Sequence, residues 1–202
     1  MIDIIEIQPS DLNLYDAIPS RFLVKTILVP ELVDEGLGGI TLREQPVSHP
    51  YIKDYDTYGE IPSDWPKLFD VTNWIFFLAM EKAQVFGGAV VAFDTTGVSM
   101  LEARSDLSVL WDIRVRTRGR GCGILLFRHA AEWSRVRGCR QMKIETQNVN
   151  VPACKFYQRM GASLGEIRCH GYANVPAVAD EVMLCWYLDL KMSKSGRGES
   201  RS

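Results

Sequence analysis

The segment 112–137, DIRVRTRGRGCGILLFRHAAEWSRVR, combines residue types that bind phosphate groups. Its arginines can form charge-assisted hydrogen bonds with phosphate oxygens, and its glycines let the backbone approach a ligand closely. Apolar residues alternate before the glycines, as in a strand, and recur every three or four positions after them, as in a helix. The glycine turn therefore leads into a helix N-terminus, where free backbone N–H groups and the helix dipole favour a bound polyphosphate.

Three known glycine-loop patterns are candidates for this turn. A P-loop is excluded, because Gly123 is followed by two apolar residues and not by Lys and then Ser or Thr. A dinucleotide fingerprint would need its third glycine at Ile124, although Glu145, at the end of the next strand, could mimic the ribose-binding acid. The third pattern is Arg118-x-x-Gly121-x-Gly123. A tight turn with exposed arginines and no ligand remains the alternative to a phosphate site.

A second motif lies in the segment 145–161, ETQNVNVPACKFYQRMG. It consists of an asparagine, a small residue three positions later, an aromatic–tyrosine pair and a closing glycine. Together with the Arg-x-x-Gly-x-Gly loop, this motif resembles the coenzyme-binding sequence of the GNAT superfamily of N-acetyltransferases. The residues that carry the second motif are Asn150, Ala153, Phe156, Tyr157 and Gly161.

The resemblance covers residues 85–190 well and the N-terminal third only loosely. The segment 171–190, GYANVPAVADEVMLCWYLDL, makes the chain similar to the streptothricin acetyltransferase branch of the superfamily. Two features depart from the family pattern. Few residues separate the strand from Arg118, so the approach to the loop is short, and Ala162 replaces the Phe that commonly follows the helix-ending glycine.

The resemblance implies that acetyl-CoA is the co-substrate and indicates where it binds. Backbone N–H groups of residues 120–123 would hold the pyrophosphate, and Arg118 would add positive charge. The strand before the loop would pair with the pantetheine arm through Ile113 and Val115. The expected coenzyme-binding residues are Ile113, Val115, Arg118, Gly119, Arg120, Gly121, Cys122, Gly123, Asn150 and Ala153. No metal site is expected, because the cysteines and histidines lack ligand spacing.

Acetyl transfer to an amine requires removal of the amine proton and protonation of the departing thiolate. By resemblance, Tyr157 is the tyrosine near the coenzyme sulfur that protonates the thiolate, and a core-packing role is its alternative. Asp112 is the leading candidate for taking or relaying the amine proton, with a purely orienting carboxylate as an equal alternative. Glu145 is a second candidate, and its alternative is a solvated residue at a strand end.

The acceptor is expected to contact the segment 49–65, HPYIKDYDTYGEIPSDW. Its acids would attract a cationic amine, and its tyrosine faces would contact one. Asp54, Tyr55 and Asp56 are the predicted acceptor-binding residues, and a solvated acidic loop is the alternative.

Three functions fit these residues. The first is an acetyl-CoA-dependent N-acetyltransferase that acts on a primary amine of a small cationic molecule, as the branch resemblance implies for streptothricin-type antibiotics. The second is a GNAT enzyme that acetylates a protein amine. The third is a catalytically silent acyl-CoA-binding module, which would need neither Tyr157 nor Asp112. The presence of both residues favours an enzyme.

Hydrophobic periodicity predicts the elements that must position these residues. Strands are expected at 3–8, 21–29, 39–43, 74–81, 85–93, 107–115, 141–147, 162–167 and 181–189, and helices at 12–18, after Gly123 and after Asn150. In the strand 107–115, alternation places Asp112 on the face opposite to Trp111, Ile113 and Val115.

This order predicts an α/β (α+β) fold with a GNAT-like mixed, mostly antiparallel central sheet and flanking helices, in a single domain. The acetyltransferase domain is expected to span 1–190. Residues 1–70 would form a variable N-terminal part, and residues 71–190 the core with the coenzyme-binding motifs. The polar tail 191–202 is expected to be disordered.

Composition narrows the classes further. The chain has 202 residues, 47% of them hydrophobic, which suits one domain with an ample core. Its net charge of -2 gives no reason to expect a nucleic-acid or membrane partner. Five scattered cysteines and an acidic N-terminus without signal-peptide character predict a cytoplasmic protein. A homodimer is compatible with the sequence.

Overall fold

The computed structural model describes residues 2–58 and 60–190, and its main feature is a mixed sheet of seven strands in the order β1-β4-β5-β6-β7-β9-β8. Only β6 and β7 run parallel, and the other neighbouring strands are antiparallel. The strands are β1 (Asp3–Ile7), β4 (Ile75–Glu81), β5 (Gln84–Phe93), β6 (Leu107–Val115), β7 (Gln141–Gln147), β8 (Ser163–Arg168) and β9 (Met183–Asp189).

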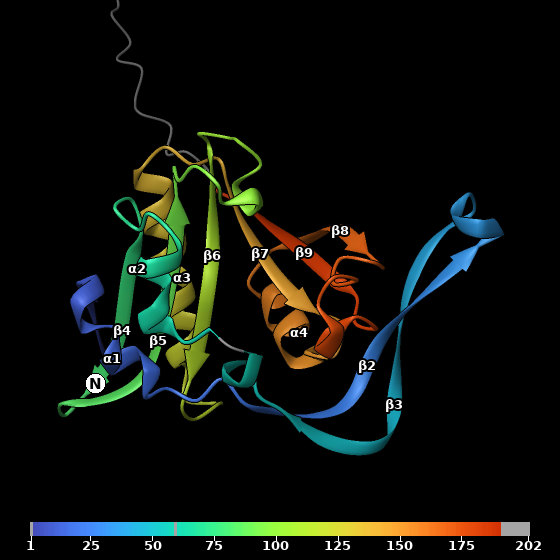
Figure 1. The fold of residues 1–202 in the computed structure, drawn as a ribbon, viewed down its shortest axis with the longest axis horizontal. Coiled ribbons are helices and arrows are strands. Elements are labelled where there is room, and N and C mark those ends of the chain that lie inside the picture. Colours follow the sequence, from blue (N-terminus) through green and yellow to red (C-terminus); the bar gives the residue numbers. More distant parts are fainter. Residues whose placement is uncertain (1, 59, 191–202) are drawn as a thin grey trace, which may run out of the picture.

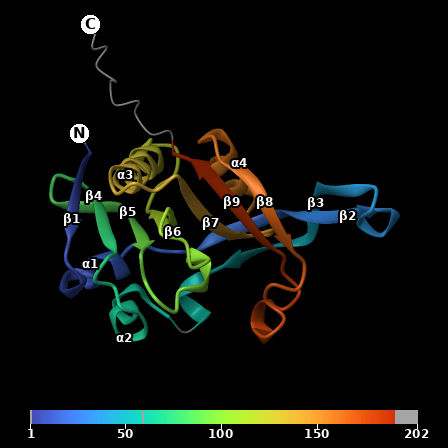
Figure 2. The ribbon, with the colours of Figure 1, turned by 90° about the horizontal axis from the view of Figure 1, so that it is seen from above.

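Helices cover both faces of this sheet (Figures 1 and 2). One face carries α3 (Cys122–Val136) and α4 (Val151–Arg159), and the other carries the short helices α1 (Asn13–Asp16) and α2 (Trp65–Leu68). The predicted mixed, mostly antiparallel sheet with flanking helices is therefore confirmed. The predicted tail 191–202 lies outside the described residues.

Each face of the sheet has its own hydrophobic core. On the α3–α4 face, the buried side chains of Phe127 and Trp133 pack with sheet residues such as Ile144. On the opposite face, the fully buried Tyr15 packs against β5, where Gly88 makes room for its ring. A Cβ at residue 88 would lie 2.3 Å from the ring of Tyr15, so glycine is required for this close approach.

The parallel strands β6 and β7 separate partway along their length. Residues 107–110 pair with residues 141–144, and beyond that point β6 stays with β5 while β7 stays with β9. The backbone of the last residues of β6 is therefore open on the side that faces β7. Figure 1 shows the two strands diverging.

A β-bulge in β6 changes which side chains face the two cores. The register with β5 shifts between Val90 and Val91, so that Trp111 is left without a partner in the β5 register. Trp111 packs against the α1–α2 core, whereas Ile113 and Val115 pack against the α3–α4 core. The simple alternation predicted for Trp111 was wrong, because a bulge inserts one extra residue into the period of two.

The strands β2 (Phe22–Val33) and β3 (Gly39–Lys53) form a separate two-stranded sheet that extends away from the main sheet (Figures 1 and 2). Both strands are longer than predicted, and β3 includes residues 49–53, the first part of the segment that was expected to contact the acceptor. Its prolines are tolerated, because a two-stranded sheet has only edge strands. Near its base, the Leu28 N–H donates to the Asn148 carbonyl, and the Asn148 Nδ2 donates to the Leu28 carbonyl.

Candidate active site

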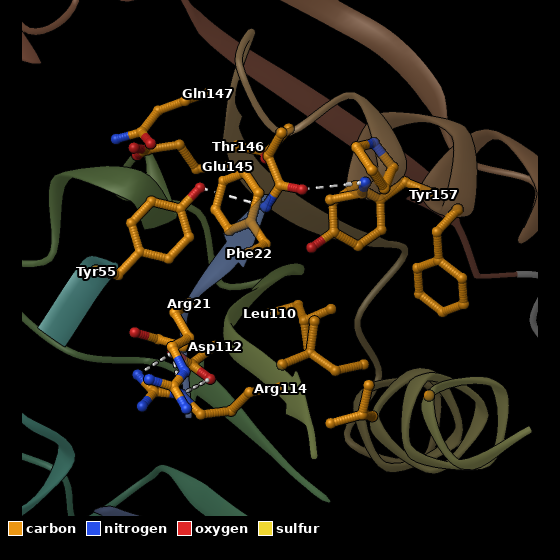
Figure 3. Close-up of a pocket in the computed structure, with 18 of the residues that line it drawn as sticks. Arg21, Phe22, Tyr55, Leu110, Asp112, Arg114, Glu145, Thr146, Gln147 and Tyr157 are labelled. Atoms are coloured by element: carbon orange, nitrogen blue, oxygen red, sulfur yellow. Dashed lines mark hydrogen bonds and ion pairs between the residues drawn. The ribbon is translucent and has the colours of Figure 1, made fainter. Parts of the chain in front are cut away.

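A cavity of about 930 Å³ occupies the opening between β6 and β7. One part of it is lined by residues of the glycine loop, including Arg118 and Gly121, and by residues of α4. Another part is lined by the turn Tyr55–Tyr58 and by residues of the β8–β9 connection, including Tyr172. The cavity thus joins the predicted coenzyme residues to two of the predicted acceptor residues, Tyr55 and Asp56. Figure 3 shows its central part.

The glycine loop presents open backbone at the start of α3. Gly119 and Gly121 have φ angles of +83° and +78°, and a Cβ at either residue would meet nothing within 4 Å. Gly121 is the N-cap of α3 and offers no side-chain cap to the helix. Cys122, the first residue of α3, is buried. Such a helix start fits a pyrophosphate group.

The arginines of the loop have different surroundings. Arg118 lines the cavity and lies 6.0 Å from the ring centre of Phe22. Arg120 also lines the cavity, but its Nη2 pairs with Glu81 at 3.0 Å. Arg116 donates to two backbone carbonyls, those of residues 17 and 85. Arg118 is therefore the loop arginine best placed to add charge to a bound phosphate.

The other predicted coenzyme residues also border the cavity. Ile113, Val115, Gly123 and Ala153 line it. Asn150 lines it too, and its side chain has two partners: its Oδ1 accepts from the backbone N–H of residue 153 at 3.3 Å, and its Nδ2 donates to the Tyr55 hydroxyl at 3.3 Å. Asn150 thus caps α4 and connects that helix to the Tyr55–Tyr58 turn.

Tyr157 on α4 is 6% exposed and lines the cavity. Its ring packs against Phe127 and Phe156, with centre-to-centre distances of 6.2 and 5.6 Å. Burial raises the pKa of its hydroxyl strongly, and the neighbouring Tyr55 and Asp112 raise the pKa further. The phenol is therefore protonated at neutral pH, and Figure 3 shows it directed into the cavity.

Asp112 on β6 already has a cationic partner. Its carboxylate accepts hydrogen bonds from the Tyr15 hydroxyl at 2.7 Å and from Arg114 Nη2 at 2.9 Å. Arg114 Nη1 also donates to Asp56 at 2.9 Å, so the buried guanidinium joins β6 to the Tyr55–Tyr58 turn. Burial would lower the pKa of Arg114, but the charges of Asp112 and Asp56 raise it above its ordinary value.

Glu145 on β7 has different partners. Its Oε1 accepts from the Tyr172 hydroxyl at 2.7 Å, and no cation within residues 2–58 and 60–190 forms an ion pair with it. Burial, followed by the charge of Glu145, raises the pKa of Tyr172 strongly, so that this phenol stays a donor. Glu145 lines the cavity and is therefore a carboxylate available to a ligand.

The predicted acceptor residues are only partly brought to the cavity. Tyr55 and Asp56 line it, but Asp56 is bound to Arg114. Asp54 accepts from the Ser20 hydroxyl at 2.8 Å and from the backbone N–H of residue 56, which fixes the turn. Asp54 and Asp56 thus stabilise the turn rather than form a free anionic surface.

Sequence reasoning missed several residues of the site: Tyr15, Phe22, Arg114, Gln147 and Tyr172. The sequence could have revealed Arg114, because it lies two residues after Asp112 on the same predicted strand and therefore on the same face. The sequence contains no pattern that predicts the roles of Tyr15 and Tyr172, since only the fold brings them to carboxylates that are far away in the sequence.

A diverging parallel strand pair, with a glycine turn at a helix start and a buried tyrosine facing the gap, defines a fold and site of the N-acetyltransferase class. The Acetyltransferase (GNAT) family matches residues 40–162, and the chain belongs to this family. It is an N-acetyltransferase that uses acetyl-CoA as its co-substrate. No described helix has the length and apolar character needed to cross a membrane.

Several proteins with assigned functions are similar to this chain. The chain is 29% identical to a streptothricin acetyltransferase of Streptomyces lavendulae, over 76% of this chain and 77% of that protein. It is 26% identical to a streptothricin acetyltransferase of Escherichia coli, over 83% of this chain and 85% of that protein. The crystal structure of nourseothricin acetyltransferase superimposes with a TM-score of 0.73 at 26% identity, covering 94% of this chain and 99% of that one. A Bacillus anthracis structure, assigned as a streptothricin acetyltransferase in complex with acetyl coenzyme A, also superimposes with a TM-score of 0.73 at 26% identity, covering 94% of this chain and 99% of that one.

Proposed function

We propose that this enzyme acetylates a primary amine of a small cationic molecule of the streptothricin type, and that acetylation inactivates such an antibiotic. The observation that carries the proposal is Glu145, a carboxylate without a cationic partner among the described residues, in the same cavity as Tyr157. The names of the similar proteins support the choice of acceptor. We place the reaction in the cytoplasm, where free thiols such as the five cysteines persist.

The coenzyme residues act by binding and alignment. Backbone N–H groups at the start of α3 and the side chain of Arg118 hold the pyrophosphate, and the open edge of β6 around Ile113 and Val115 pairs with the pantetheine arm. Bound acetyl-CoA supplies an activated thioester. This arrangement directs the thioester into the gap between β6 and β7, where alignment with an amine lowers the barrier to transfer.

Two side chains move the protons. Glu145 takes a proton from the acceptor ammonium, so that the nitrogen lone pair is free to attack the carbonyl carbon. When the carbon–sulfur bond breaks, the protonated Tyr157 donates its proton to the leaving thiolate. The attacking nitrogen, which became positively charged on forming the carbon–nitrogen bond, then loses a second proton through water, and this proton restores the Tyr157 phenol. In this mechanism Asp112 is a positioning residue, because its carboxylate is held by Arg114 and Tyr15. This assignment favours the orienting role for Asp112 over that of the base.

The function is tested by measuring thiol release from acetyl-CoA over a panel of amines: streptothricin, lysine, a polyamine and a peptide with a free N-terminus. We expect the highest kcat/KM with streptothricin. Tyr157→Phe, which removes only the hydroxyl, should lower kcat by about 10²–10⁴-fold while coenzyme affinity stays the same. A preference for the peptide, or no transfer to any amine, would refute the proposal.

A further inference from the structure

The wall of the cavity formed by β7 carries a second polar group next to Glu145. Residues 145 and 147 lie on the same face of the strand, because side chains alternate along it. Both side chains line the cavity, and Figure 3 shows them together at one end of it. The side-chain oxygen of Gln147 is buried, yet no donor within residues 2–58 and 60–190 reaches it.

Buried acceptors are normally paired, because an unpaired one loses its hydrogen bonds to water without replacement. Two buried cations of the protein are already engaged. Arg114 is bound to Asp112 and Asp56, and the buried Lys53 is bound to Glu181. The end of the cavity at Glu145 and Gln147 therefore offers two acceptor groups, and among the described residues neither group is bound to a cation.

We propose that Gln147 accepts a hydrogen bond from a second amino group of the acceptor, so that the enzyme selects diamines over monoamines. The inference rests on the proposed function, in which Glu145 serves the reacting amine. Same-face neighbours on a strand are about 6.6 Å apart, a separation that the two nitrogens of a short aliphatic diamine can span. A second ammonium at this distance supplies the donor that the Gln147 oxygen lacks.

The test compares putrescine with n-butylamine, which has the same carbon chain but one amine. Calorimetry of each amine with the CoA-bound enzyme gives Kd without requiring turnover, and steady-state assays give KM and kcat. We expect the wild-type enzyme to bind putrescine more tightly. Gln147→Met keeps the length of the side chain and removes its polar end. It should raise the Kd of putrescine about 10- to 100-fold and leave the Kd of n-butylamine unchanged.

Two further variants complete the test. Gln147→Glu keeps an acceptor oxygen and should preserve or increase the preference for putrescine. Gln158→Met makes the same substitution at an exposed position of α4 and should change the Kd of neither amine.

Equal effects of Gln147→Met on both amines would overturn the inference, as would equal binding of the two amines by the wild type. Loss of the preference in Gln147→Glu would also overturn it, because that result would mean that the amide N–H faces the ligand. Failure of the proposed function has a different signature: no amine of the panel is acetylated, whereas the calorimetric comparison still reports on Gln147.

Discussion

Each of the two strands that diverge around the cavity carries a carboxylate just beyond the residues where the strands pair. Each carboxylate is followed two residues later by a polar side chain. On β6 the pair is Asp112 and Arg114, and on β7 it is Glu145 and Gln147. The β6 pair contains its own cation and forms an ion pair at 2.9 Å. The β7 pair contains none, and its carboxylate accepts only a phenol hydroxyl among the described residues.

This difference shows that residue type alone does not decide which carboxylate serves a substrate. A buried carboxylate that is paired with a cation has already offset its desolvation, whereas one without a cation gains from binding a cationic ligand. The β6 wall is therefore suited to fix the site, and the β7 wall to receive the acceptor. Four predictions test this division.

The largest effect is expected when the β7 carboxylate is removed. Glu145→Gln should lower kcat by about 10²–10⁴-fold, because it removes the group that takes the amine proton. The free energy of unfolding should change little, since Tyr172 can still donate to the amide oxygen. Steady-state kinetics and chemical denaturation measure the two effects. If kcat stays within about threefold of wild type, far short of the expected range, Glu145 is a solvated residue at a strand end and not the base.

The corresponding change on β6 should act on stability instead. Asp112→Asn leaves the buried guanidinium of Arg114 with Asp56 as its remaining carboxylate, and we expect a loss of about 3 kcal/mol in unfolding free energy. Urea denaturation measures this loss. In the fraction that stays folded, kcat should fall much less than in Glu145→Gln. If the Asp112→Asn protein is stable and its kcat is reduced as strongly as in Glu145→Gln, then Asp112 is the base, and the roles of the two strands are exchanged.

A third change gives β7 the arrangement of β6. Gln147→Arg places a cation beside Glu145, and we expect the KM for cationic amines to rise about 10- to 100-fold, because a buried charge-assisted bond is lost and repulsion is added. The Kd of acetyl-CoA should stay near that of wild type. Unchanged amine KM values would show that the acceptor binds elsewhere in the cavity.

The smallest effect concerns the tyrosines that donate to the two carboxylates. Burial and the neighbouring carboxylate raise the pKa of both Tyr15 and Tyr172 above the usual value. In the unfolded chain these phenols ionise near pH 10, while in the folded protein they remain protonated. The unfolded state therefore holds fewer protons above pH 10, and stability falls as the pH rises, by up to about 1.4 kcal/mol per pH unit for each tyrosine.

Tyr15→Phe and Tyr172→Phe should each make this alkaline decline shallower by the contribution of one proton. Stability measured by denaturation between pH 9 and 11 tests the effect, with the wild type as reference. The two walls are expected to behave alike here, although their carboxylates differ. Slopes identical to that of the wild type would show that these hydroxyls ionise at ordinary pH values.

The sequence predicted the local motifs that line the cavity better than the contacts between distant segments. The glycine loop and the Asn150–Tyr157 motif are local patterns, and a glycine turn or a helix cap is determined by neighbours in the chain. The role of Asp112 could not be predicted, because its donor Tyr15 lies 97 residues away and a bulge alters the alternation of β6. The length of β3 was also missed, because this strand continues through two prolines, which a strand tolerates only where it lies at an edge.

The hydrogen bonds between Leu28 and Asn148 affect how the protein folds. This contact spans 120 residues of chain, and the ion pair between Lys53 and Glu181 spans 128. The ion pair between Arg120 of the glycine loop and Glu81 spans 39 residues, far fewer than these two contacts. Because the entropy of closing a loop grows with its length, contacts of high contact order form late. During synthesis on a ribosome, we therefore expect the segment around the glycine loop to become structured first. The contacts of β2 and β3 with residues 148 and 181 can form only after the last strands have emerged.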